Sequence, residues 1–138
     1  MPVAPERTGW RDEGISREHR KWGIGCTFLD FDFFGIEYEF GNPKLLVEYK
    51  NEHAEMQSAA NPRYQALIKL GNAAQIPVIG CRYKDDFSEF RPVPLNDSAK
   101  QYIKEIKWIS KEAWITLLYT IKGHEVTPEF LASMEIEI

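Results

Sequence analysis

The sequence predicts one α/β domain, with a central mixed β-sheet flanked by helices. Its 138 residues suit a single domain, because domains commonly run to about 100–200 residues. Apolar residues make up 43% and charged residues 28%, which is typical of a folded globular chain. Stretches with the two-residue period of strands alternate along the chain with stretches typical of helices. We therefore expect a single domain over residues 1–138.

The first part of the chain predicts a helix, a strand and a hairpin. Residues 16–22 are typical of a short helix, which two glycines then end. Residues 27–34 alternate apolar side chains with Asp30 and Asp32, so the two aspartates share one face of a strand. Gly35 interrupts the alternation, as at a β-bulge. The predicted hairpin comprises a strand at 36–40, a turn at 41–43 and a strand at 44–50.

The second part predicts helices around two further strands. Residues 62–74 form a helix with proline in its first turn, and residues 51–60 begin a helix before it. Residues 76–83 are a nearly continuous apolar run, as expected of a buried strand. A turn at Asp85-Asp86 precedes a strand at 87–95, whose prolines place its end at a sheet edge. Two helices follow, one capped by Asn96 or Asp97 and running through Lys104, the other at 110–122 and capped by Ser110.

The charge is distributed unevenly along the chain. The net charge of −4 argues against a protein that binds nucleic acid through bulk charge. Residues 26–60 carry two basic and seven acidic side chains, whereas residues 61–111 carry nine basic and five acidic ones. The acidic block contains large apolar residues, which is unlike a solvated face. The charge pattern therefore leaves open a local contact with phosphate that a bound cation bridges.

The composition also bears on the compartment. Cys26 and Cys81 stand 55 positions apart without a CxxC motif, which suits a reducing cytoplasm and excludes a disulfide framework or a cysteine-rich zinc site. No apolar run approaches the roughly 20 residues that cross a bilayer. Residues 1–11 contain no apolar stretch, so we expect no signal peptide. These features predict a cytoplasmic protein with no membrane contact.

The candidate chemistry lies in Asp30 and Asp32 together with Glu48-Tyr49-Lys50. Residues two apart in a strand point the same way, so Glu48 and Lys50 project together and Tyr49 packs on the opposite side. If the two strands are neighbours, the aspartates meet Glu48 and Lys50. Like charges about 4 Å apart repel by roughly 4 kcal/mol at an effective dielectric constant of 20. One lysine offsets only part of this repulsion, and a divalent cation offsets more.

Carboxylate oxygens are hard ligands, so the cluster predicts Mg²⁺, Mn²⁺ or Ca²⁺ rather than zinc. A metal ion held by carboxylates beside a lysine suits phosphodiester hydrolysis. The metal binds the phosphate, lowers the pKa of a bound water and stabilises charge on the phosphate oxygens. Lys50 then serves either as a base for the water or as a phosphate contact.

The segment LDFDFFGIEYEFGNPKLLVEYK, with the helix PRYQALIKLGNAAQ and the strand IPVIGCRY, resembles the PD-(D/E)XK nuclease superfamily. It is most similar to small stand-alone members from bacteriophages and bacteria. The resemblance covers a core at about 15–95, and a helical part follows at about 96–138. It implies a restriction-endonuclease-like core: a helix, a three-stranded antiparallel meander, a helix and a fourth strand. The literal PD dipeptide is absent, because Leu29 and Phe31 precede the two aspartates.

By this resemblance, Asp32 and Glu48 bind Mg²⁺ or Mn²⁺ and Lys50 positions the attacking water. Asp30 is an auxiliary ligand, and the backbone carbonyl of Tyr49 a further one. Which aspartate is the main ligand stays open.

The resemblance also implies two supporting residues. Glu18 matches an acidic position on the first helix, with a surface ion pair to Arg20 or Lys21 as the alternative. Gln65 matches a glutamine that binds phosphate or water, with an ordinary helix-surface amide as the alternative. His53 is close enough in sequence to Lys50 to reach a phosphate, although a surface histidine is favoured.

Basic residues of the first helix and of the middle segment are candidate DNA contacts. They are Arg17, Arg20, Arg63, Lys69, Arg82 and Lys84. No zinc finger or helix-turn-helix pattern is present, so recognition of DNA shape or branching, or weak sequence preference, is expected. The apolar region around Trp108, Trp114, Leu118 and Tyr119 suits either a homodimer or packing of the last helix on the sheet.

The sequence thus predicts a Mg²⁺-dependent DNA endonuclease in a bacterial or phage-infected cell. The alternative is a catalytically silent regulator with the nuclease fold that binds DNA or protein. A glycosidase would also use two carboxyl groups but gives no reason for Lys50.

Overall fold

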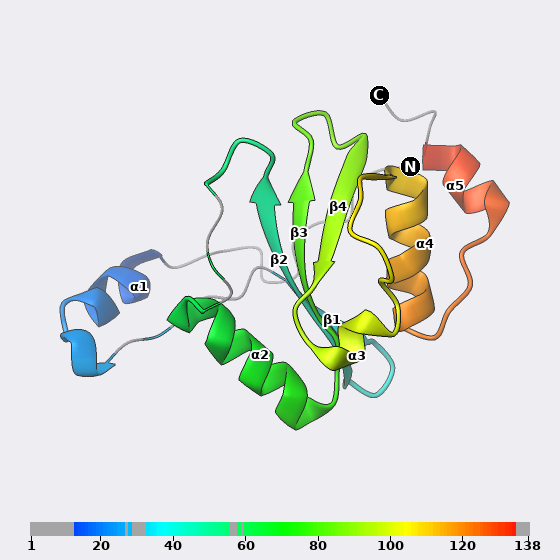
Figure 1. Cartoon of the computed structure of the whole chain (residues 1–138). Coiled ribbons are helices and arrows are strands. Elements are labelled where there is room, and N and C mark those ends of the chain that lie inside the picture. The colour runs from blue at the N-terminus through cyan, green and yellow to red at the C-terminus, as the bar shows by residue number, and fades with distance from the viewer. Residues whose placement is uncertain (1–12, 27, 29–32, 56–57, 59, 135–138) are drawn as a thin grey trace.

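The computed structural model describes residues 13–26, 28, 33–55, 58 and 60–134. It is an α/β fold with a mixed sheet flanked by helices, as the sequence predicts (Figure 1). Within the described residues the sheet has five strands in the order β1-β2-β3-β4-β5, an order that the sequence does not predict. The strands are β1 (Phe33–Glu37), β2 (Asn42–Asn51), β3 (Val78–Tyr83), β4 (Glu89–Pro94) and β5 (Ile109–Ser110). The helices are α1 (Glu13–Arg20), α2 (Pro62–Ala74), α3 (Asp97–Lys100), α4 (Lys111–Ile121) and α5 (Pro128–Met134), with a 3₁₀ turn at Ile24–Cys26.

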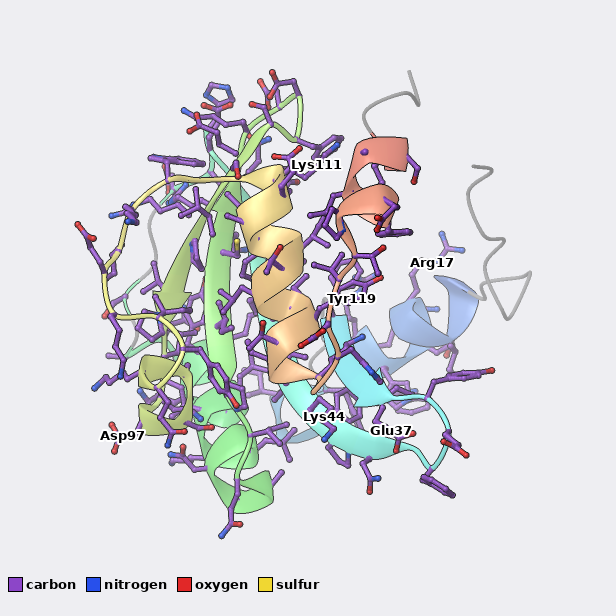
Figure 2. The ribbon with its side chains drawn as sticks, turned by 90° about the vertical axis from the view of Figure 1, so that its right-hand side faces the viewer. Arg17, Glu37, Lys44, Asp97, Lys111 and Tyr119 are labelled. Carbon is purple, nitrogen blue, oxygen red and sulfur yellow. The ribbon has the colours of Figure 1, made fainter. Side chains whose placement is uncertain are left out.

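Helices cover both faces of the sheet, α2 on one and α4 on the other (Figure 1). The core under α2 consists of Leu46, Leu67, Ile76 and Val78. The core under α4 is larger and consists of Leu45, Val47, Ile79, Cys81, Phe90, Ala99, Ile103, Trp114 and Ile121. Neighbouring residues of one strand alternate between the two cores, because strand side chains point to opposite faces. Figure 2 shows α4, from Lys111 to beyond Tyr119, lying along the sheet.

The β1–β2 hairpin contains the predicted bulge. The antiparallel register shifts between Gly35 and Ile36. A Cβ atom at Gly35 would collide with the Leu45 side chain, so the close approach requires glycine. The prediction of a strand at 36–40 is wrong in its second half, because the turn begins at residue 38 and β2 already at Asn42.

β2 and β3 are parallel neighbours in the sheet, and α2 lies in the crossover that connects them. The predicted helix at 62–74 is confirmed, with Pro62 at its start and the Asn61 side chain accepting from the Arg63 amide. The predicted helix at 51–60 is wrong. Residue 51 still belongs to β2, and residues 52–53 form a turn.

The C-terminal part agrees with the sequence in its caps and differs in length. The Asn96 side chain caps α3 by accepting from Ala99, but α3 ends at Lys100 rather than Lys104. Ser110 caps α4 as predicted. The prolines of β4 pair only with β3, because the two-residue β5 reaches only Glu89 and Phe90.

The last long helix packs within its own chain, which was one of the two expectations for the apolar C-terminal region. Trp114 is 2% exposed and donates a hydrogen bond to the Tyr49 hydroxyl at 3.0 Å. Leu118 packs on the same core, and Tyr119 contacts Phe130 of α5. None of the helices in the described ranges is both long and apolar enough to span a bilayer.

Candidate functional site

The two faces of β2 divide as the sequence predicts. Leu45, Val47 and Tyr49 pack toward α4, whereas Glu48 and Lys50 lie together on the α2 side. Tyr49 is held in the aromatic cluster with Trp114, and burial raises the pKa of its phenol to about 12. The opposite face of the strand is therefore the one available for chemistry.

Glu48 is a buried carboxylate, with 2% of its surface exposed. Arg63, in the first turn of α2, donates to it twice: from Nε to Oε2 at 3.3 Å and from Nη2 to Oε1 at 3.1 Å. A buried charge is costly unless it is paired and hydrogen-bonded, so Arg63 is a principal counter-ion of Glu48. The helix start thus places a cation against the strand.

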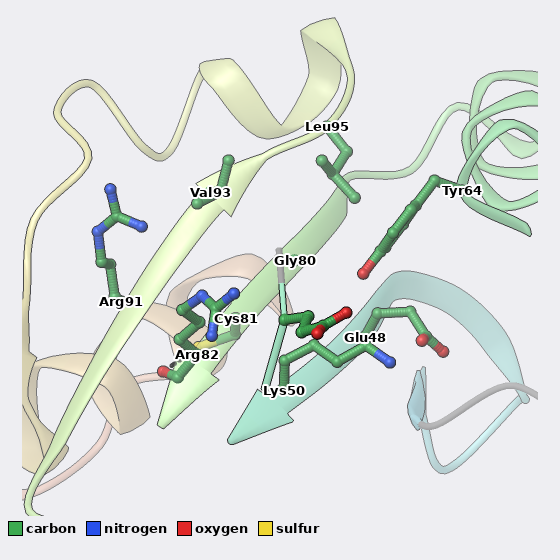
Figure 3. Close-up of a pocket in the computed structure, with 10 residues that line it drawn as sticks. Glu48, Lys50, Tyr64, Gly80, Cys81, Arg82, Arg91, Val93 and Leu95 are labelled. Carbon is green, nitrogen blue, oxygen red and sulfur yellow. Dashed lines mark hydrogen bonds between the residues drawn. The ribbon is translucent and has the colours of Figure 1, made fainter. Parts of the chain in front are cut away.

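Glu48 and Lys50 lie in a pocket of about 170 Å³ (Figure 3). Tyr64 reaches toward them from α2, one residue after Arg63. This size is smaller than the roughly 300–1,000 Å³ of drug-sized ligand sites, so the pocket suits a small group. The lining residues are Glu48, Lys50, Glu55, Tyr64, Gly80, Cys81, Arg82, Arg91, Val93 and Leu95.

Two of the expected metal ligands, Asp30 and Asp32, lie outside the described residues. Glu18 is placed in an exposed ion pair with Lys21 at 2.9 Å, the alternative that the sequence left open. Such a pair contributes little to stability. Gln65 is half-buried in the first turns of α2, but it is not among the residues that line the pocket.

The candidate DNA contacts fall into two groups. Arg17, Arg20 and Lys69 are exposed on the helices α1 and α2. The others are engaged within the protein: Arg63 with Glu48, Arg82 with main-chain carbonyls, and Lys84 with Glu52 at 3.3 Å and the Trp108 ring at 4.3 Å.

A separate polar cluster joins the end of β2 to the β3–β4 turn. His53 Nε2 lies 3.0 Å from Asp85 Oδ2, and Asn51 donates to the other oxygen of Asp85 at 2.7 Å. Glu52 accepts from the Asp85 amide and from Lys84. Each of these groups is already paired, so we interpret the cluster as structural: its hydrogen bonds connect the turn after β2 to the β3–β4 turn.

The pocket offers some of the ligands that a hard divalent cation prefers. Glu48 and Glu55 supply carboxylate oxygens of the right kind, and Lys50 lies on the same face. Within the described ranges, the only set of three metal-binding side chains that converge is Glu52, His53 and Asp85. Glu48 therefore belongs to no convergent set of three such side chains among the described residues. The residues fit in chemistry, and Arg63 competes for the same carboxylate.

Sequence reasoning missed Glu55 and did not expect Tyr64 to line the site. The sequence does not single out Arg91. Its place opposite Arg82 depends on a loop over residues 85–88, because a two-residue turn at Asp85-Asp86 would put Glu89 opposite Arg82. Glu55 follows the end of β2 after an irregular turn, for which the sequence offered no signal.

Comparison with family models, with curated proteins and with solved structures finds no match to this chain. The functional argument therefore depends on the residues themselves.

Proposed function

We propose that this protein is a metal-dependent nuclease that hydrolyses phosphodiester bonds in DNA, of the PD-(D/E)XK kind. The observation that carries the proposal is the placement of Glu48 and Lys50 side by side on one face of β2, in a small pocket (Figure 3). The strand leads through α2 into the parallel neighbour β3. This order of elements is the one that the resemblance implies around an E-x-K motif.

In this proposal, Glu48 and Asp32 hold Mg²⁺ or Mn²⁺, with Asp30 and the Tyr49 carbonyl in support. Asp32 directly precedes Phe33, the residue that pairs with Val47 beside Glu48. The bound metal supplies an activated water and stabilises charge on phosphate. Lys50 holds the water or the phosphate in position from the same strand face. The proposal also includes Glu18 and Gln65 as supporting residues. Its candidate DNA contacts are the exposed residues Arg17, Arg20 and Lys69.

A nicking assay on supercoiled plasmid and on branched DNA tests this function. We expect wild-type protein with Mg²⁺ or Mn²⁺ to cut, and EDTA to stop the reaction. Lys50→Met should abolish cutting, because a side chain of similar length without charge cannot contact phosphate. Lys104→Met, on an exposed residue outside the pocket, is the matched control. Equal cutting by Lys50→Met would contradict the assignment.

One observation favours a second candidate, a regulator that keeps the fold without the reaction. Arg63 already neutralises Glu48 with two hydrogen bonds, as expected of a carboxylate that does not need a metal. Calorimetric titration with Mn²⁺ separates the candidates. A nuclease site should bind Mn²⁺ with an affinity that Glu48→Gln reduces at least tenfold, whereas a silent site should show no Glu48-dependent binding.

A further inference from the structure

Three cations stand in one row across the sheet beside the proposed catalytic residues. Lys50 of β2 pairs in register with Arg82 of β3, and Arg82 pairs with Arg91 of β4. Paired residues of adjacent strands project to the same face of a sheet. All three side chains line the pocket that contains Glu48, and Figure 3 shows them succeeding one another across the three strands.

Such a row is unfavourable by itself. Like charges directly opposite one another on neighbouring strands destabilise a sheet. Arg82 is partly compensated, because its Nη1 donates to the carbonyls of Asn51, Glu52 and Ala54 at 3.1, 3.4 and 2.9 Å. These bonds hold the guanidinium in place between its two neighbours.

The outer two cations have no such compensation. Within the part of the chain that the structure describes, the Lys50 and Arg91 side chains make no hydrogen bond or ion pair, although both are partly buried. The pocket also contains Glu55 and Glu48, but Arg63 neutralises the second. The balance of charge along the row is therefore positive.

Gly80 keeps the space beside the row open. It pairs in register with Glu48 and carries no side chain, and the nearest atoms to a Cβ built there belong to Leu95 at 3.5 Å. Neighbouring strands lie about 4.8 Å apart, so the backbones of Lys50 and Arg91 are separated by roughly 10 Å. In Figure 3 the Lys50 ammonium is turned toward Glu48, and both side chains are long enough to turn onto a single small anion between them.

We propose that Lys50, Arg82 and Arg91 form an anion subsite that binds one phosphate group of a polynucleotide backbone. Guanidinium groups match phosphate geometry, and the apolar walls formed by Val93 and Leu95 strengthen charge interactions. The subsite rests on the proposed nuclease function for its ligand. It adds Arg91 of β4 as a substrate-binding residue.

The subsite is tested without catalysis, in EDTA. ¹⁵N-labelled protein is titrated with inorganic phosphate and with a thymidine tetranucleotide, and the Nε–Hε signals of Arg82 and Arg91 are followed. We expect saturable shifts with both probes. Arg91→Gln should weaken both affinities about tenfold or more, because a charge-assisted hydrogen bond is lost. Lys104→Gln, which removes a charge outside the pocket, should leave them unchanged.

The outcomes separate the subsite from the nuclease proposal. Absence of a saturable shift, or equal affinity in wild type and Arg91→Gln, would overturn the subsite even if the protein cuts DNA. Binding of inorganic phosphate but not of the tetranucleotide would overturn the backbone ligand and count against the nuclease function. Folding of Arg91→Gln is checked by its melting temperature. The temperature should not fall, because the substitution relieves repulsion with Arg82.

Discussion

Arg63, in the first turn of α2, donates two hydrogen bonds to the carboxylate of Glu48 in β2. The two residues are 15 positions apart in the sequence. The Arg63 side chain is 30% exposed and the Glu48 side chain 2% exposed. The pair therefore fastens the helix to the strand at the same place as the candidate catalytic face. It also puts an internal cation where a metal would bind, so the stability of the fold and metal binding become linked.

Arg63→Gln should destabilise the protein by about 3 kcal/mol, because it leaves a buried carboxylate without its counter-ion. Urea unfolding measures the change. Lys69→Gln, on an exposed position of the same helix, should change stability by less than about 0.5 kcal/mol. Adding Mn²⁺ should raise the melting temperature of Arg63→Gln more than that of wild type, since the metal then meets no competing guanidinium. Equal stability of the two variants would contradict this linkage.

Alkaline pH should destabilise the fold through Tyr49. Burial raises the pKa of this phenol to about 12 in the folded chain, against about 10 when unfolded. A group whose folded pKa is raised contributes stability below its unfolded pKa and loses it as the pH rises through the folded value. The stability difference between wild type and Tyr49→Phe should be constant below about pH 9. It should then shrink by roughly 2 kcal/mol toward pH 12.

Denaturant titrations at a series of pH values check this expectation. Tyr102→Phe, on an exposed residue outside the core, is the control. A stability difference between wild type and Tyr49→Phe that does not change with pH would mean that the phenol is not held neutral by burial.

Close contact between α2 and β3 depends on Gly71. A Cβ atom there would collide with Val78 Cγ2, and Val78 is 1% exposed, so one of the two elements must shift. Overpacking of this kind costs about 1–3 kcal/mol, which outweighs the roughly 1 kcal/mol that alanine gains over glycine in a helix. Gly71→Ala should therefore lower the free energy of unfolding by up to about 2 kcal/mol. Gly80→Ala, whose Cβ meets Leu95 at 3.5 Å, should be tolerated, and equal effects of the two would refute the packing argument.

The local features of the fold could be predicted from the sequence because they depend on local chemistry. Pro62 and Asn61 set the start of α2, Ser110 sets the start of α4, and the alternation in β2 puts Glu48 and Lys50 on one face. The errors concern segments where propensity competes with chain geometry. The turn after β1 begins at residue 38, earlier than predicted, and residues 52–55 leave the strand without forming a helix.

The partners of the site residues could not be predicted in the same way. The counter-ion of Glu48 lies one helix away, and only the packing of α2 on the sheet decides that Arg63 faces inward rather than toward solvent. A buried carboxylate on a strand needs a counter-ion or hydrogen-bond donors, and here the first turn of the following helix supplies them. The position of Arg91 beside Arg82 likewise follows only from the pairing of β4 with β3.

The central claim is that Glu48 belongs to a divalent-metal site beside Lys50. A crystal soaked with Mn²⁺ and measured at the manganese absorption edge tests it most directly. We expect one anomalous peak within about 2.0–2.6 Å of a Glu48 carboxylate oxygen, with Asp32 or Asp30 on its other side and the Arg63 guanidinium displaced. The absence of a peak at Glu48, with both Arg63 hydrogen bonds retained, would contradict the account.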